Sequence, residues 1–284
     1  MLRVPAFAKL NLDLRVLYRR PDGFHELRSV FQTISLADRI GIDFRKTRRT
    51  EIRVTGSVDI PDNLIVRAAR LCLDEMKLTA SIGFELDKRI PMGAGLGGGS
   101  SDAAAVLLSL PKLARRDVPS ERILAIAAQL GSDVPFFLLG GTAAVLGRGE
   151  EVYPIEDRRS PHVLLVSPDV HVSTPDAYRA LSARLAPGSH HTKLAAFQSF
   201  LWGAGQPAND FEEVVFDQHP RLKAIRNQLR RAGATTAMMT GSGSSVFGIF
   251  PDRATLEFAA ARFRNERVFP VRFLPRSAYL TARC

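Results

Sequence analysis

Alternating apolar and polar residues predict a β-rich beginning to this chain. In residues 6–18, Leu10, Leu12 and Leu14 fall on one face of a strand, and a polar turn follows at residues 19–23. Apolar spacing then predicts one amphipathic helix among several short strands. The strands are expected at residues 31–34, 38–44, 51–54 and 82–86, and the helix at residues 65–76.

The rest of the pattern mixes helices and strands without regular strand–helix–strand units, which favours an α+β fold. A charged stretch begins near residue 157, so we expect a first domain at residues 1–157 and a second at residues 158–284. Helices are expected at residues 103–110, 120–130, 176–185, 221–232 and 256–264, and strands at residues 163–166, 246–250 and 268–273.

Composition places the chain among ordinary globular proteins. Its 284 residues allow two domains with real cores, and 45% of them are hydrophobic and 24% charged. No apolar run approaches the roughly 20 residues of a membrane span, and the first residues resemble neither a signal nor a transit peptide. We therefore expect a cytoplasmic protein without a membrane partner. Cys72 and Cys284 have neither a metal-binding spacing nor a disulfide framework.

The formal net charge of +10 permits nucleic-acid binding, but the basic residues are scattered. They form short groups in predicted loops and at helix ends, which is more typical of a solvated surface than of a nucleic-acid groove. We therefore expect no nucleic-acid partner. A positive surface also attracts small anionic substrates. The basic groups are residues 45–49, 115–116, 158–159 and 230–231.

The strongest chemical signal is a glycine-rich segment at residues 91–102. Five of the nine residues from Gly93 to Ser101 are glycine, so their backbone N–H groups can approach a ligand closely. A helix that begins near Ser100 would direct its free N–H groups and the positive end of its dipole to the same place. These features predict a phosphate-binding loop, with a flexible turn that binds no ligand as the alternative.

Two common kinds of phosphate loop fit this segment poorly. A Walker A loop is excluded because no lysine followed by serine or threonine comes after the last glycine. The dinucleotide pattern G-x-G-x-x-G matches formally at Gly93, Gly95 and Gly98, with Asp117 further on. However, Asp117 lies in a polar connection, and the preceding segment 82–90 is charged where a buried parallel strand should be apolar. A loop with paired serines at the helix start is the remaining interpretation.

Phosphoryl transfer also needs cations and a group that orients the acceptor hydroxyl. Lys9 and Asn11 share the face of the first strand opposite its leucines, which is either a functional face or the solvent face of an edge strand. Asp133 follows a predicted helix and lies two residues before Pro135 and an apolar run, so it is either a helix cap or a proton acceptor. Phe24 and His25 lie in the first turn, where they either contact a base or pack within the turn.

Taken in chain order, these motifs resemble the GHMP kinase superfamily. The resemblance rests on Ala-Lys-Leu-Asn-Leu at residues 8–12, on the glycine-rich loop and on Gly-Ser-Gly-Ser-Ser at residues 241–245. A narrower resemblance is to the branch that phosphorylates a diphosphocytidyl sugar alcohol. It rests on further segments at residues 20–25, 62–70, 87–93, 131–136 and 209–212.

The resemblance implies a two-domain fold, with an N-terminal ribosomal-S5-like β/α domain and a C-terminal, ferredoxin-like α/β sandwich. It implies ATP-dependent phosphorylation of the 2-hydroxyl of 4-diphosphocytidyl-2-C-methyl-D-erythritol, a step in the non-mevalonate route to isopentenyl diphosphate. The products are the 2-phosphate and ADP. ATP is then the phosphoryl donor, Mg²⁺ is expected, and the small-molecule partner is a cytidine diphosphate derivative. The oligomeric state is left open.

By position, the resemblance implies that Lys9 and Asp133 are the catalytic pair. Asp133 would orient the hydroxyl or accept its proton, and Lys9 would keep Asp133 ionised. The expected substrate-binding residues are Asn11, Phe24, His25, Thr174 and Tyr178, with the aromatic and histidine rings around the cytosine. The expected ATP-binding residues are Asn63, Lys88, Pro91, Met92, Gly93, Ala94, Gly95, Leu96, Gly97, Gly98, Gly99, Ser100, Ser101, Gly241, Ser242 and Gly243.

The chain departs from the family pattern at three positions. Family members often carry tyrosine where this chain has Phe24, phenylalanine where it has Tyr178, and glycine where it has Ala94. Both aromatic positions keep a stacking face, and Ala94 matters only if its φ must be positive. Two alternative functions stay open: another small-molecule GHMP kinase, of the homoserine or mevalonate type, and a basic RNA-binding module.

Overall fold

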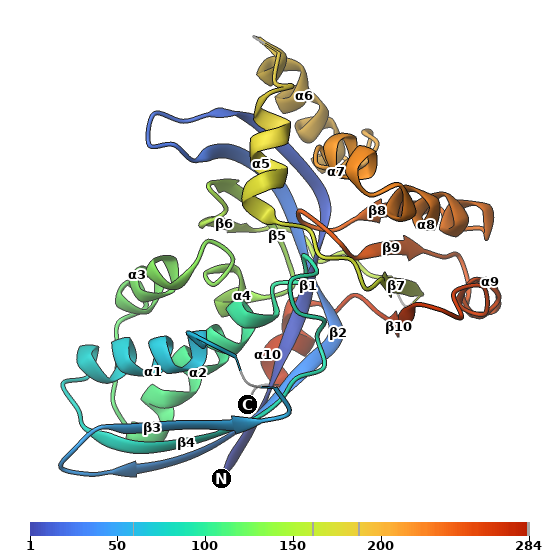
Figure 1. Ribbon diagram of the computed structural model, residues 1–284. Helices are drawn as coiled ribbons and strands as arrows, with labels where there is room; N and C mark the ends of the chain where they lie inside the picture. Colours follow the sequence, from blue (N-terminus) through green and yellow to red (C-terminus); the bar gives the residue numbers. More distant parts are fainter. Residues whose placement is uncertain (59, 161, 187, 283–284) are drawn as a thin grey trace.

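The computed structural model describes residues 1–58, 60–160, 162–186 and 188–282, so Cys284 lies outside the described residues. The molecule contains two sheets, and each has its own helices (Figure 1). The first sheet is largely antiparallel and the second is entirely so. The expected α+β fold is therefore confirmed. In the described ranges, no helix is long and apolar enough to cross a membrane.

The first sheet has the strand order β3-β4-β2-β5-β6, and β1 pairs with β2. β3 and β4 are parallel, and the other neighbours are antiparallel. Four helices cover one face and form the largest core with it (Figure 1). The elements are β1 (Leu2–Arg19), β2 (His25–Lys46), β3 (Glu51–Gly56), β4 (Ala80–Asp87), β5 (Thr142–Gly147), β6 (Glu151–Pro154), α1 (Leu64–Glu75), α2 (Gly98–Ala114), α3 (Ser120–Leu130) and α4 (Phe136–Leu139).

The second sheet has the antiparallel order β10-β7-β9-β8. Its last helix, α10, returns to the first sheet, where Tyr279 packs on Phe7 and donates a hydrogen bond to the carbonyl of Phe137. The elements are β7 (Val163–Ser167), β8 (Thr236–Met239), β9 (Val246–Ile249), β10 (Arg267–Val271), α5 (Thr174–Ser182), α6 (Ser189–Leu201), α7 (Glu212–Gln218), α8 (Pro220–Arg231), α9 (Arg253–Ala260) and α10 (Arg276–Thr281).

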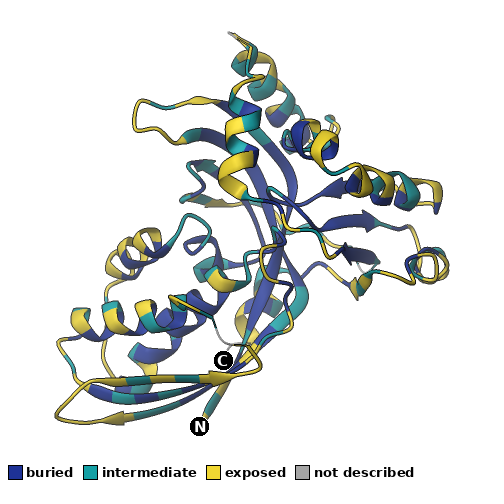
Figure 2. Ribbon diagram, viewed as in Figure 1, coloured by how far each residue is buried: buried dark blue, intermediate teal, exposed yellow. Residues whose placement is uncertain are grey.

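The long hairpin of β1 and β2 joins the two halves. Along β1, Ala6 belongs to the first core, Leu10 to a core shared with the second sheet, and Leu14 to the core of the second half. Figure 2 shows the residues in the middle of this hairpin as buried, and these include side chains from both faces of β1. The polar face of β1 is therefore internal, so the possibility that it is the solvent face of an edge strand is wrong.

Several element boundaries differ from the sequence prediction. The predicted strands at residues 31–34 and 38–44 are parts of one strand, β2, which continues between them and pairs with β1 there through Ala37 and Phe7. The helix predicted at residues 103–110 begins at Gly98 and continues through Pro111. Four short or weakly patterned elements were not predicted: β6, α6, α7 and α10. In α6, for example, only Phe197 and Phe200 are fully buried, so its apolar stripe is faint.

Candidate active site

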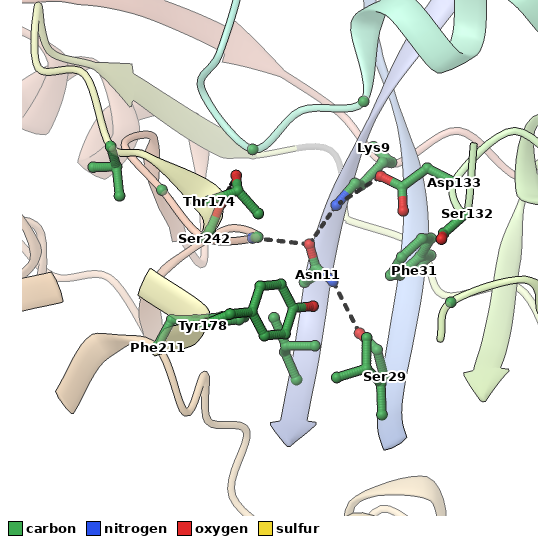
Figure 3. A pocket seen from close by; sticks show the side chains of 18 of the residues that line it. Lys9, Asn11, Ser29, Phe31, Ser132, Asp133, Thr174, Tyr178, Phe211 and Ser242 are labelled. Carbon is green, nitrogen blue, oxygen red and sulfur yellow. Dashed lines mark hydrogen bonds and ion pairs between the residues drawn. The ribbon is translucent and has the colours of Figure 1, made fainter. Parts of the chain in front are cut away.

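A cavity of about 510 Å³ lies between the two halves of the molecule. Its walls come from β1 and β2, the glycine-rich loop, the turn before α4 and three segments of the second half (Figure 3). The predicted residues Lys9, Asn11, Asp133, Thr174 and Tyr178 all line it. The fold therefore brings together residues that are far apart in the sequence.

Lys9 is the buried cation of this cavity. Its Nζ donates a 2.6 Å hydrogen bond to Asn11 Oδ1 and lies 3.6 Å from Asp133 Oδ2 (Figure 3). It also lies 4.5 Å from the centre of the Phe31 ring. Burial lowers the pKa of Lys9, while the nearby Asp133 carboxylate acts to raise it. The ammonium is thus held by an amide, a carboxylate and an aromatic face at once.

Asp133 is accessible where Lys9 is not. Its side chain is 31% exposed, against 4% for that of Lys9, so a substrate hydroxyl can approach it from the cavity. Asp133 does not cap the next helix, because Pro135 holds the cap position of α4 and no side-chain cap bond is formed. Its carboxylate instead faces Lys9 across the cavity wall (Figure 3). The interpretation of Asp133 as a helix cap is therefore wrong.

Asn11 ties the first strand to the second half. Its side-chain oxygen accepts hydrogen bonds from the backbone N–H of Gly241 at 2.9 Å and from Thr240 Oγ1 at 3.2 Å, besides the bond from Lys9. Its Nδ2 donates to Ser29 Oγ at 2.9 Å. Every polar atom of the amide is engaged. Asn11 therefore fixes the position of Lys9 relative to residues 241–245, the second glycine turn.

The glycine-rich loop has the conformation that its composition predicts. Gly93, Gly95 and Gly97 have φ values of 63°, 76° and 69°, which favour glycine. Ala94 is not among the residues with positive φ, so the alanine fits the loop. α2 begins at Gly98 and directs its first N–H groups to the end of the loop.

A second cavity of about 350 Å³ lies on the other side of this loop. Its lining contains the predicted ATP-binding residues Asn63 and Lys88 and every loop residue from Pro91 to Ser100. Ser101 is fully buried and is not among the lining residues. The two cavities share three loop residues, Gly93, Gly95 and Gly97. The glycine loop is therefore a common wall between them.

Lys88 holds a buried charge cluster beneath the second cavity. Its Nζ lies 2.5 Å from Asp38 Oδ2 and 2.7 Å from Asp102 Oδ2. Burial raises the pKa of Asp102, and Lys88 partly offsets this. Asp102 Oδ1 and Ser101 Oγ have no hydrogen-bond partner among the described residues. The first turn of α2 thus has two buried oxygen atoms beside the loop that could ligate a cation.

The described ranges contain no group of three or more histidine, cysteine, aspartate or glutamate side chains able to hold a metal ion. The single carboxylate of Asp102 with the hydroxyl of Ser101 still suits Mg²⁺, which usually takes one or two protein carboxylates together with substrate phosphates. Cys72 is a buried free thiol in α1, and burial raises its pKa to about 12, which makes it unreactive.

The predicted base-binding residues lie at the far end of the larger cavity. His25 and Tyr178 stack on each other, with ring centres 4.9 Å apart, and His25 Nε2 lies 2.5 Å from Ser182 Oγ. Burial and the charge of Arg19 lower the pKa of His25. Phe24 is exposed in the β1–β2 turn. Neither His25 nor Phe24 is among the residues that line the cavity itself.

The second glycine turn forms the wall of the larger cavity next to the glycine-rich loop. Thr174 Oγ1 and Ser242 Oγ are 2.7 Å apart, and both residues line the cavity with Gly241 and Gly243 (Figure 3). A Cβ added to Gly241 would lie 3.0 Å from the Cα of Gly95. The two glycine segments therefore meet at a distance that side chains would prevent.

Sequence reasoning missed several residues of this region. Ser29 and Phe31 line the cavity because β2 pairs with β1, and Thr240 and Asp38 hold the backbone of the site through their side chains. Arg148 also lines it, from the turn between β5 and β6. Only Arg148 had a sequence signal, since it stands between two glycines.

Two family models match the chain. The GHMP kinases N terminal domain matches residues 63–141, and the GHMP kinases C terminal domain matches residues 191–268. The first match contains the glycine-rich loop and Asp133, and the second contains the turn at Gly241. The expected membership of this superfamily is therefore confirmed.

Close relatives cover nearly the whole chain. A 4-diphosphocytidyl-2-C-methyl-D-erythritol kinase of Solibacter usitatus (strain Ellin6076) is 53% identical, over 96% of this chain and 89% of the relative. The enzyme of the same name from Bacillus subtilis (strain 168) is 36% identical, over 94% of this chain and 95% of the relative.

Solved structures agree with these relatives. A crystal structure of 4-(cytidine 5'-diphospho)-2C-methyl-D-erythritol kinase has a TM-score of 0.81 and 36% identity, covering 96% of this chain and 99% of that one. A homoserine kinase from Cytophaga hutchinsonii has a TM-score of 0.74 at 16% identity, covering 97% and 96%, and so shares the fold alone. The chain is a small-molecule kinase that belongs to the GHMP kinases, in the family of the 4-diphosphocytidyl-2-C-methyl-D-erythritol kinases.

Proposed function

We propose that this chain transfers the γ-phosphoryl group of ATP to the 2-hydroxyl of 4-diphosphocytidyl-2-C-methyl-D-erythritol. The names of its relatives support this acceptor. The observation that carries the proposal is the Lys9–Asp133 pair, which lies in the larger cavity beside the glycine loop. That loop borders both cavities, so ATP in one and an acceptor in the other would meet at it.

ATP binds in the smaller cavity. Its phosphates accept hydrogen bonds from the N–H groups of the glycine loop and of the first turn of α2, where the helix dipole favours negative charge. Its adenine lies towards Asn63, on the α1 side of this cavity. Asp102 and Ser101, whose Oδ1 and Oγ have no hydrogen-bond partner among the described residues, would hold Mg²⁺, which would neutralise charge on the phosphates.

The acceptor binds with its reacting end at Lys9 and its cytosine at His25 and Tyr178. Asp133 orients the 2-hydroxyl and accepts its proton as the hydroxyl oxygen bonds to the γ-phosphorus of ATP. The bond from that phosphorus to its bridging oxygen breaks, and ADP leaves. Lys9 keeps Asp133 ionised and balances charge on the transferred group. Asn11 holds Lys9 in place.

We place the enzyme in the cytoplasm, where ATP is available, with a small-molecule acceptor and no nucleic-acid partner. The scattered basic residues support attraction of two anionic substrates rather than a groove for RNA. The domain boundary after residue 157 stays a prediction as well.

An assay that couples ADP release to absorbance tests the proposal with three acceptors: the diphosphocytidyl compound, homoserine and mevalonate. We expect turnover with the first alone. Asp133→Ala should lower kcat by about 100- to 10,000-fold and keep ATP binding. Asp117→Ala, an exposed carboxylate in the α2–α3 connection, is the control and should leave kcat unchanged. Turnover of homoserine or mevalonate instead, or salt-sensitive RNA binding without ATP turnover, would refute the proposed function.

A further inference from the structure

Arg148 stands in the tight turn between β5 and β6. Two glycines with positive φ flank it, Gly147 at 66° and Gly149 at 108°. Glu150 anchors it twice, because its carboxylate accepts from the backbone N–H of Arg148 at 2.7 Å and from its Nε at 3.0 Å. The two terminal guanidinium nitrogens have no hydrogen-bond partner among the described residues. The side chain is therefore held in one orientation with its outer donors available.

The turn that carries Arg148 lies between the two ends of the larger cavity. On one side the guanidinium lies 4.8 Å from the centre of the Phe24 ring, next in sequence to His25. On the other side its turn packs on the catalytic turn, since a Cβ added to Gly149 would lie 3.3 Å from Cβ of Ser132. Arg148 itself lines the cavity. The guanidinium thus lies at the base end, and the turn that carries it packs on the turn that carries Asp133.

The charges of the lining favour an anion at this point. Lys9 is paired with Asp133, and Arg148 is the other permanently charged cation of the lining. Glu150 neutralises its Nε in part, and the Asp22 carboxylate at the base end also interacts with it electrostatically, but no lining carboxylate lies within hydrogen-bonding distance of its outer nitrogens. His171 also lines the cavity, but it lies beside Gly93 of the phosphate loop and so is nearer the ATP side.

We propose that Arg148 binds the diphosphate bridge of the acceptor. The inference rests on the proposed function, because in a diphosphocytidyl sugar alcohol the diphosphate lies between the cytidine and the sugar alcohol. Each phosphate of that bridge carries a negative charge. The planar guanidinium fork can give two parallel hydrogen bonds to phosphate oxygens, which a lysine ammonium cannot. Arg148 therefore selects acceptors that carry the diphosphate.

The test compares cytidine with cytidine diphosphate as ligands of the wild-type chain and of Arg148→Ala, by calorimetry and by competition with the acceptor. We expect Arg148→Ala to weaken cytidine diphosphate binding, and to raise the acceptor KM, by about 10- to 100-fold. Cytidine affinity and the KM for ATP should stay within about two-fold of wild type. Arg148→Lys should fall between the two, because it keeps the charge without the fork.

Arg45→Ala is the matched control, since Arg45 is an exposed arginine of β2 outside the cavity lining, and it should change none of these constants. If the wild type turns over the acceptor and Arg148→Ala keeps its affinity for cytidine diphosphate, the assignment of Arg148 is wrong and the proposed function stands. If Arg148→Ala weakens cytidine and cytidine diphosphate equally, the diphosphate assignment is also wrong. If the wild type neither turns over the acceptor nor binds cytidine diphosphate, the proposed function fails and this inference with it.

Discussion

Lys9 carries a charge in a place where folding alone would not favour one. It is 3% exposed, and burial lowers its pKa despite the carboxylate of Asp133. Replacing a buried ion pair with apolar residues of similar volume is often neutral or stabilising, and here the partner of Lys9, Asp133, is 31% exposed and stays hydrated when the lysine is replaced. The lysine is therefore explained by its chemistry at the cavity and not by a contribution to stability.

Lys9→Met separates these two roles. An unfolded lysine has a pKa of 10.5 and the folded pKa lies lower, so the charged form of Lys9 costs stability at pH 7, and this cost declines as the pH rises to 10.5. We expect turnover to fall by about 1,000-fold or more, while the free energy of unfolding in urea stays equal or rises. Lys46→Met, an exposed lysine at the end of β2, should change neither quantity. A loss of about 2 kcal/mol or more in Lys9→Met would show that the ion pair stabilises the fold.

His25 predicts how acceptor binding depends on pH. Its pKa is lowered from 6.5 by burial and by Arg19, so the ring is neutral at pH 7. A neutral ring can accept a hydrogen bond from a base edge, and it loses this ability when it gains a proton. We expect the acceptor KM to be constant above pH 6.5 and to rise on acidification below it. His25→Gln should remove this rise, and an equally steep rise in that variant would assign the titration to another group.

At the scale of residues, the sequence predicted the pairing of Lys9 with Asn11 because side chains alternate along a strand. It did not predict their burial, which depends on the second half covering β1. The cluster of Asp38, Lys88 and Asp102 was missed for a similar reason. Lys88 is 50 positions from Asp38 and 14 from Asp102, and the three side chains meet only through sheet pairing and the start of α2.

At the scale of elements, the glycine loop and α2 act as one phosphate-binding unit. The loop passes close to the Lys9 side chain and the Phe137 ring at Gly97, where a Cβ would lie 3.2 Å and 2.9 Å from them. The helix then begins one residue later. Composition revealed this unit, because a run of glycines directly before a helix is typical of an anion-binding site. Its true start at Gly98 was less visible, since glycine is a poor helix former.

Gly97→Ala and Gly99→Ala form a matched pair. Alanine at Gly97 would be strained at a φ of 69° and would push on Lys9 and Phe137, so we expect a fall in kcat of at least about 10-fold and weaker ATP binding. At Gly99 the nearest atom to a new Cβ is Leu64 Cδ1 at 3.6 Å, and the backbone is helical. This alanine keeps the backbone N–H of Gly99, so we expect a clearly smaller loss of activity than in Gly97→Ala, together with stabilisation of the fold by up to about 1 kcal/mol. Equal losses in both variants would mean that the loop tolerates no side chain at all, and that its contact with Lys9 is unimportant.

At the scale of the molecule, β1 and β2 make the two halves one structure. β1 supplies Ala6 to the first core and Leu14 to the second, and α10 of the second half packs back on Phe7. Sequence patterns indicated the two halves and their α+β class, because each sheet has its own strand signals. They did not indicate this exchange of elements, since the short α10 has only one buried side chain, Tyr279.

This continuity predicts a single unfolding transition, although chains of this length often unfold in steps. Phe84 lies in the first core and Phe250 in the second. We expect Phe84→Ala and Phe250→Ala each to lower the free energy of unfolding by about 3–5 kcal/mol. In both variants the whole chain should still unfold in one urea transition. The unfolding transition followed by circular dichroism should coincide with the loss of amide protection in β4 and with that in β7. Phe258→Ala replaces an exposed phenylalanine and should leave the free energy of unfolding within about 0.5 kcal/mol of wild type. If Phe250→Ala instead unfolds β7 while β4 stays protected, the halves are independent, and the hairpin of β1 and β2 serves only to place Lys9 and Asn11 between them.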